Sequence, residues 1–322
     1  MATGTGVQAK LSITPGSAGE TAYGTLTAAT RGLEFNNENL EYRKNVVQSM
    51  GLRGTGSQNL PLSTRRVVTT SDAGGDFEID LMTRGCGILL AHCMGSFPSY
   101  TAGAYAFTLG DPSSKSFSTQ VQVPQYDGTI TTKTLKGCKV TGFEIGMDNQ
   151  GIAKLKTTVD AQALVTDQAA ATVTYVNSGS YDPLHFAGAN LKVDTVNSTI
   201  VKDFTLTVDN ALKTDRYNLT ANGLKQAPVQ NGFRKITGKF AAEFSGTGIL
   251  AKFLADTNIA LQLTITNGSS SLDINIPVAR LNGSTPTVKG PDAVDVDFEF
   301  EVLYDGTNEP LTITYTTADT AL

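Results

Sequence analysis

Tryptophan is absent from this sequence, and histidine and cysteine are scarce, with two and three residues respectively. There is no Cys-x-x-Cys pair, so a zinc site has almost nothing to be built from. Cys86 and Cys93, if they share a helix, lie about 10 Å apart along its axis, which is too far for a disulfide. Cys138 makes the number of cysteines odd. We therefore expect no metal site and no bound cofactor.

Charge is sparse as well, because charged residues make up only 17% of the chain. The net charge is −5, and the lysines and arginines are scattered, without the basic stripe that a nucleic-acid-binding protein usually carries. The longest apolar run, residues 88–93, is far too short to span a bilayer. Residues 1–10 contain no apolar run typical of a signal peptide. We expect a soluble protein, synthesised in the cytoplasm, with no membrane partner.

What the sequence does contain favours β structure. Hydrophobic residues make up 40% of its 322 residues, enough to bury a core. Threonine, valine, glycine and asparagine are abundant, and these residues favour half-buried strands and turns.

The most informative feature is an internal repeat, in which segments of the second half match segments of the first in order. Each half has an apolar strand, a Gly-x-Gly-Ile-Leu segment, alternating strands that lead to an Asx-Gly turn, and a final hairpin. The first-half segments are 76–81, 85–89, 117–124 with Asp127-Gly128, and 140–147 returning through 155–159. Their second-half counterparts are 240–244, 246–250, 272–277 with Asn282-Gly283, and 296–302 returning through 311–315.

The Gly-x-Gly-Ile-Leu segments open the two predicted helices, each with one apolar stripe. The stripes comprise Ile88, Leu89, His92 and Cys93 in the first half, and Ile249, Leu250, Phe253 and Leu254 in the second. We expect Gly95 to end the first helix, and Thr247 and Asn258 to begin and end the second.

These patterns predict a mainly β fold with two tandem β-sandwich or barrel domains, each flanked by one α-helix. The predicted divisions are an N-terminal arm at 1–30, a first domain at 31–165, a connector at 166–199 and a second domain at 200–322.

Two features could indicate a cofactor-binding or catalytic site, and a structural role explains each of them better. Gly246-x-Gly248-x-x-Ala251 follows a strand and opens a helix, but no βαβ unit follows it, as a dinucleotide site requires. His92 is adjacent to Cys93, yet neighbours on a helix do not face each other, and their counterparts in the second half are apolar. We predict no catalytic residue and no enzymatic activity.

Most of the chain resembles the major tail tube proteins of siphophages. The resemblance is carried by residues 19–25, 31–35, 204–210 and 234–244. It implies a virion protein with a β-barrel or sandwich flanked by a helix. Its copies would form rings that stack into a hollow tube, through which double-stranded DNA passes without specific binding. The further partners implied are the tape measure, tail tip and tail terminator proteins.

Two domains per chain suggest three chains per ring with pseudo-sixfold symmetry, and a hexamer of the full chain is the alternative. Asp295, Asp297, Glu299 and Glu301 lie at a spacing of two, so they share one face of a strand. That face lines the lumen of the tube or, equally well, belongs to the outer surface.

Ring stacking has its own candidate segment, the polar and glycine-rich loop at residues 48–64. Its candidate contact residues are Gly51, Arg53, Gly54, Gly56 and Gln58. The arm at 1–30 could act likewise, and the alternative for the loop is an ordinary mobile surface segment.

Other functions remain open. A capsid decoration protein, a baseplate subunit or an adhesin-like module would share the strands but not the matched helix-and-hairpin units. A carbohydrate-binding module usually exposes tryptophan or tyrosine, and here tryptophan is absent and tyrosines number only ten.

Overall fold

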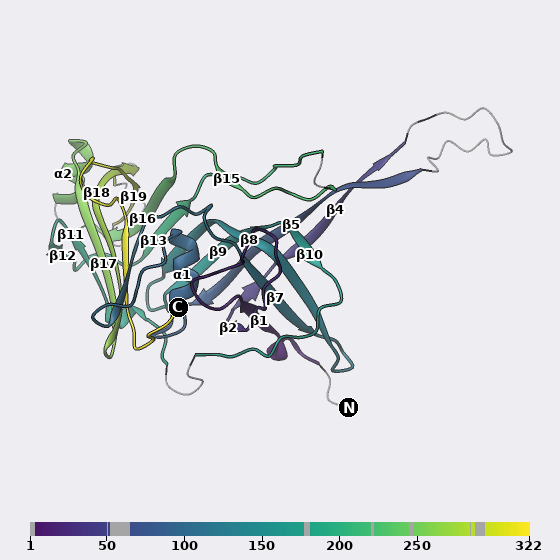
Figure 1. Ribbon diagram of the computed structural model, residues 1–322. Coiled ribbons are helices and arrows are strands. Elements are labelled where there is room, and N and C mark those ends of the chain that lie inside the picture. The colour runs from purple at the N-terminus through teal and green to yellow at the C-terminus, as the bar shows by residue number, and fades with distance from the viewer. Residues whose placement is uncertain are drawn as a thin grey trace.

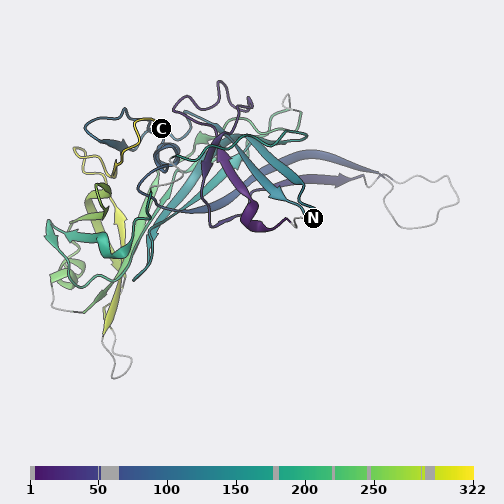
Figure 2. The ribbon, with the colours of Figure 1, turned by 90° about the horizontal axis from the view of Figure 1, so that it is seen from below.

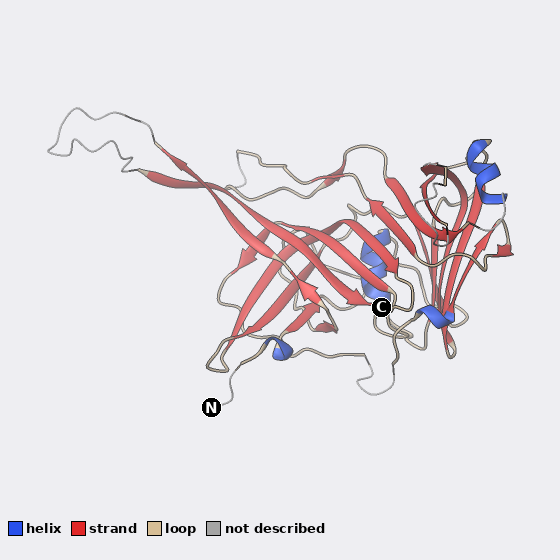
Figure 3. Cartoon of the chain, turned by 180° about the vertical axis from the view of Figure 1, so that it is seen from behind, coloured by secondary structure: helices blue, strands red, loops and turns tan. Residues whose placement is uncertain are grey.

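The computed structural model describes residues 4–49, 51, 65–176, 181–219, 222–244, 248–283, 285–286 and 294–322. Over these residues the fold is mainly β, as predicted, and its α-helices are the two that were expected, α1 (Gly87–Met94) and α2 (Gly248–Leu254) (Figure 3). Two short 3-10 helices, η1 (Gly6–Gln8) and η2 (Phe186–Gly188), each lead into a strand.

In chain order the strands are β1 (Lys10–Ile13), β2 (Arg31–Leu33), β3 (Asn37–Glu38), β4 (Glu41–Gln48), β5 (Arg66–Asp80), β6 (Ala104–Thr108), β7 (Phe117–Pro124), β8 (Ile130–Met147), β9 (Lys154–Ala161), β10 (Ala163–Val165), β11 (Ala189–Val193), β12 (Val196–Asn197), β13 (Phe204–Asp209), β14 (Leu212–Lys213), β15 (Val229–Gln230), β16 (Lys235–Glu243), β17 (Ile259–Asn267), β18 (Ser270–Gly283), β19 (Asp295–Val302) and β20 (Thr312–Thr316).

In the first half, one long strand belongs to two sheets. The N-terminal part of β8 pairs with β7 and β10, and β7 continues through β1 to β2. The C-terminal part of β8 pairs with β9, which continues through β5 to β3 and β4. All these pairings are antiparallel, as expected for strands with one buried face.

The same pairing order recurs in the second half. There β18 is the long strand: its first part pairs with β17 and β20, and its last part pairs with β19. Beyond them, β17 continues through β11 to β12, and β19 continues through β16 to β13. In Figure 1 the second-half strands, green to yellow, stand beside the purple to teal strands of the first.

This pairing changes two of the sequence assignments. The segment expected to be an N-terminal arm, 1–30, contains β1, whose Leu11 and Ile13 are fully buried. The segment expected to be a connector, 166–199, contains β11 and β12, which pair in the second sheet system. All three strands were missed because they are short and lack strong alternation. The division into two tandem domains itself stays a prediction.

Two turn predictions in the second half are wrong. Asn282 and Gly283 form no turn, because they lie at the end of β18 and pair with Glu299 and Phe298. The last two strands form no hairpin either, since β20 pairs with β18 on one side and with β6 on the other. At Asn282-Gly283 the strand β18 continues past the predicted turn, and in the last strand the local hairpin signal was overridden by pairing with β18 and the distant β6.

The helices differ in their surroundings although their sequences match. Every residue of α1 is buried, and α1 lies among the sheets of the first half (Figure 3). Gly95 ends it with a left-handed backbone at φ 69°, as predicted. No residue of α2 is buried, and Leu254 is 66% exposed. Thr247, its predicted N-terminal cap, lies outside the described residues.

The strands β4 and β5 form a long hairpin that projects away from the body of the molecule (Figures 1 and 2). Of the predicted stacking residues beyond it, only Gly51 is described, and it is exposed. Arg53, Gly54, Gly56 and Gln58 lie outside the described residues.

Candidate functional site

The two halves are joined edge to edge by strand pairing. The C-terminal part of β8 pairs antiparallel with β13, from Gly142 opposite Asp209 to Met147 opposite Phe204. A second pairing joins β6 of the first half to β20 of the second. As a result, one sheet runs without a break from β5 to β18.

This continuous sheet carries one polar face across both halves, which we call the polar face. Directly opposed residues of an antiparallel sheet point to the same side, so the register identifies its members. One row across seven strands is Glu78, Lys156, Glu144, Thr207, Thr237, Glu301 and Arg280. The next is Asp80, Lys154, Gly146, Thr205, Lys239, Glu299 and Asn282.

The opposite side of the sheet is core. The row between these two consists of Ile79, Leu155, Ile145, Leu206, Gly238, Phe300 and Leu281. All of its members except Gly238 are buried hydrophobic side chains. The Phe300 ring fills the space at Gly238, because a Cβ added there would lie 2.3 Å from that ring. The period-two alternation therefore holds on both sides of the joint.

The four carboxylates predicted to share a face, Asp295, Asp297, Glu299 and Glu301, all lie on the polar face. Glu301 is half-buried and the other three are exposed. The intervening Val296, Phe298 and Phe300 are at most 5% exposed, whereas Val302 is only partly buried. Asp295 stands opposite Glu243, and Lys202 binds both carboxylates at 2.8 and 3.2 Å. These hydrogen bonds, with Asp295 first and then Glu243, raise the pKa of Lys202.

Elsewhere the polar face is balanced by cross-strand ion pairs. Lys156 Nζ lies 2.9 Å from a carboxylate oxygen of Asp76, and Lys154 Nζ lies 3.4 Å from one of Glu78. The hydrogen bond to Asp76 raises the pKa of Lys156. Carboxylates still outnumber cations. The acidic members are Asp76, Glu78, Asp80, Glu144, Asp209, Glu243, Asp295, Asp297, Glu299 and Glu301, and the basic side chains on this face are Lys154, Lys156, Lys202, Lys235, Lys239 and Arg280.

The segment between β13 and β16 reinforces the joint, since it lies along the first half in Figure 1. Asn210 is fully buried there, and its side-chain amide donates to the carbonyl oxygens of Cys93 (3.2 Å) and Val140 (3.1 Å). The Tyr217 hydroxyl donates to the carbonyl oxygen of Ser71 at 2.8 Å. The second half is therefore held to the first by side chains as well as by strand pairing.

A buried ion cluster completes this contact. Lys225 has a side chain only 4% exposed and forms ion pairs with Asp160 and Asp72 of the first half. Burial lowers the pKa of Lys225, but its hydrogen bonds to the two carboxylates outweigh burial and raise it. Asp72 and Asp160 also line a groove of about 400 Å³.

Comparison with known protein families identifies the family of this chain. The family model described as phage tail tube protein matches residues 12–302, which is most of the chain. The chain belongs to the phage tail tube protein family. It is therefore a structural subunit of a phage tail tube, as the resemblance in its sequence predicted. A search among curated proteins finds no match.

The described part of this tail tube subunit contains no helix long and apolar enough to cross a membrane. The same residues bring together no group of three or more histidine, cysteine, aspartate or glutamate side chains that could hold a metal ion. His92 and Cys93 are buried in the core, where His92 packs on the rings of Phe97 and Phe117.

Sequence reasoning found the acidic strand of this tail tube subunit and missed the rest of the polar face. The signal was present, because Asp76, Glu78 and Asp80 alternate with Phe77 and Ile79. The lysines of β9 alternate in the same way. What the sequence lacked was the register that places these strands in one row.

Proposed function

We propose that this tail tube subunit assembles into closed rings, and that stacked rings form the hollow conduit through which the genome leaves the capsid. The observation that carries the proposal is the β8–β13 joint. At this joint one sheet passes from the first half of the chain into the second and keeps the same polar face. Neighbouring subunits in a closed ring must join their sheets in the same way. A head-to-tail contact of this kind closes on itself or grows as a helix.

In this proposal each ring contains three chains, and the two halves of each chain act as two tandem domains with pseudo-sixfold symmetry. The core boundaries stay at 31–165 and 200–322, with β1 added to the first domain and β11 and β12 added to the second. The polar face lines the lumen, where its excess of carboxylates repels DNA within about 8 Å at physiological salt. The subunit is made in the host cytoplasm and meets tape measure, tail tip and tail terminator proteins.

Electron microscopy of the purified protein tests the assembly directly. At high concentration we expect hollow rings or tubes of uniform bore, because both ends of the continuous sheet offer a partner for the next copy. Class averages should show three chains per ring. Six chains per ring would contradict the trimer. Monomers at every concentration, with or without tail tip proteins, would contradict self-assembly.

A charge reversal tests the position of the polar face. Asp295→Lys with Asp297→Lys adds positive charge to that face, so assembled tubes should retain DNA at least about tenfold more strongly at low salt. The measurement is the amount of DNA protected from nuclease by assembled tubes. The matched control is Asp127→Lys with Glu309→Lys, two exposed carboxylates outside the polar face. Equal protection in both variants would place the polar face on the outside.

A further inference from the structure

The continuous sheet has an edge beside β3 and β4 that is closed by side chains instead of by a strand. Within the described residues, β3 and β4 pair with β5 on their inner side and with no strand on their outer side. An open edge of this kind offers its backbone N–H and C=O groups to any passing strand.

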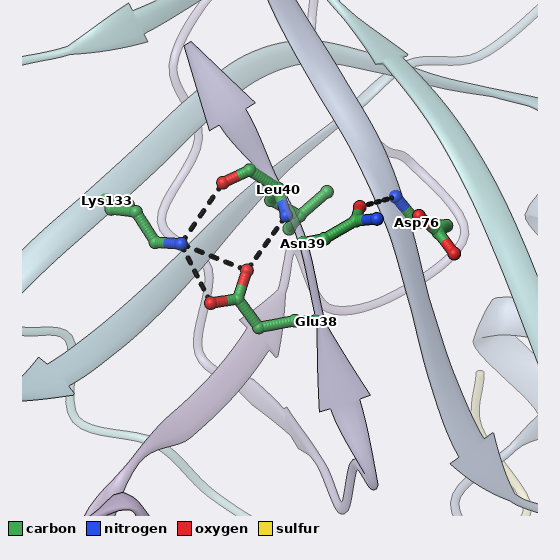
Figure 4. Close-up of polar contacts among 5 residues, drawn as sticks. All are labelled: Glu38, Asn39, Leu40, Asp76 and Lys133. Atoms are coloured by element: carbon green, nitrogen blue, oxygen red, sulfur yellow. Dashed lines mark hydrogen bonds and ion pairs between the residues drawn. The ribbon is translucent and has the colours of Figure 1, made fainter.

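Leu40, which links β3 to β4, directs both of its backbone groups to this outer side. Its N–H donates to a carboxylate oxygen of Glu38 at 2.9 Å, and its carbonyl oxygen accepts from Lys133 Nζ at 3.1 Å. Lys133 also binds the two carboxylate oxygens of Glu38 at 2.8 and 3.0 Å. Figure 4 shows this arrangement, which we call the edge cap, with Asn39 turned instead toward Asp76.

The corresponding edge in the second half is occupied by a strand. There β13 pairs with β16 on its inner side, as β3 and β4 pair with β5, and its outer side pairs with β8. Leu206 is fully buried in β13, just as Leu40 is 2% exposed in the first half. Two equivalent edges are therefore satisfied in two ways, by a strand in one and by the edge cap in the other.

A matching open edge lies at the other end of the sheet. In the first half, β8 continues past its pairing with β7 and meets β13. In the second half, β18 continues past its pairing with β17, which ends at Ala279, and its residues Arg280 to Gly283 pair only with β19. No described strand occupies the position beside them that β13 occupies beside β8.

We propose that the outer edge of β3 and β4 is the binding surface for the C-terminal part of β18 of a second copy, and that the edge cap is a removable guard on that surface. In this contact β18 of the second copy takes the role of β8, and β3 and β4 take the role of β13, so the pairing seen within one chain is repeated between two chains. The backbone of this β18 replaces Glu38 and Lys133 as the partners of Leu40. The cap protects the edge of a free subunit from indiscriminate strand addition and raises the concentration at which subunits associate.

This inference rests on the proposed assembly, and its test separates the two. Glu38→Gln with Lys133→Met removes the ion pair and frees Leu40, so association should begin at a roughly five- to tenfold lower protein concentration than in the wild type. Light scattering and size-exclusion chromatography over a dilution series measure this. The matched control is Glu78→Gln with Lys154→Met, an ion pair on the polar face whose removal leaves both hydrogen bonds of Leu40 in place, so the association concentration should stay unchanged.

Cross-linking identifies the edges that meet. The three native cysteines are buried, so introduced cysteines report alone. Glu41→Cys with Asn282→Cys should form disulfide-linked oligomers on assembly, whereas Tyr126→Cys with Asn282→Cys should not, because Tyr126 lies in the β7–β8 turn.

An association concentration that is unchanged or raised in the Glu38→Gln, Lys133→Met variant would overturn the proposal, and so would the absence of the Glu41–Asn282 cross-link. Urea unfolding of each variant shows whether loss of folding accounts for the change. Microscopy judges the proposed function separately. If the wild type forms rings and removal of the edge cap leaves the association concentration unchanged, only the proposed role of the edge cap is refuted. An uncapped variant that associates without forming rings supports the edge contact and refutes the ring.

Discussion

Lys225→Met is expected to lower the free energy of unfolding by about 3 kcal/mol, because it removes the cation that pairs with two carboxylates in a buried cluster. Lys225 is 4% exposed in its side chain, and Asp160 is 11% exposed. Without the lysine, the Asp160 carboxylate stays buried with no opposite charge to compensate it. We also expect the contact between the two halves to weaken around Lys225. The backbone of Lys225 is part of that contact, because its carbonyl oxygen accepts a hydrogen bond from Gln162 Nε2 at 3.1 Å.

Urea denaturation measures this loss, and amide exchange near Ser71 reports the loosening of the contact. Adding Asp160→Asn to Lys225→Met should restore part of the stability, because it removes the uncompensated charge. Lys213→Met is the matched control. Its pair with Asp215 spans 3.9 Å at the surface, so its loss should cost less than about 0.5 kcal/mol. If both lysine variants lose equally little stability, the cluster does not hold the halves together.

His92→Leu is expected to make the protein resist acid better. Burial, together with the smaller effects of the positive charges on Lys115 and Lys139, lowers the pKa of His92 from its ordinary value of 6.5 to about 3. Between these values the unfolded chain takes up a proton that the folded chain refuses. Stability is therefore complete above pH 6.5 and falls as the pH drops toward 3. At pH 4 this single histidine should cost about 3 kcal/mol.

The variant should lack this decline, because leucine fills a similar volume and does not titrate. Within the described residues His92 Nε2 has no hydrogen-bond partner, so its removal should cost little stability at neutral pH. The measurement is the free energy of unfolding from pH 7 to pH 4. His185→Gln serves as the control, since His185 is partly exposed. Parallel curves for the wild type and His92→Leu would show that His92 does not govern acid stability.

Local sequence determined the fold class, both helices and the alternation of the acidic strand. Each of these depends on neighbours within a few residues, such as the apolar stripe of 249–254 or the period of two in 295–302. The family was visible for the same reason, since its resemblance is carried by short segments. Turn chemistry worked at Asp127-Gly128, where Gly128 has a φ of 86°, and failed at Asn282-Gly283, where the chain stays extended in β18 and pairs with β19.

Only the tertiary structure decided which strands are neighbours. Backbone hydrogen bonds are the same for every residue, so nothing in residues 142–147 specifies β13 as their partner until the halves fold together. The same holds for β20, which pairs with β6 across more than half of the chain. The edge cap is a further case. Glu38 and Lys133 are distant in sequence, and they meet because β8 crosses from one sheet to the other and brings Lys133 to the edge.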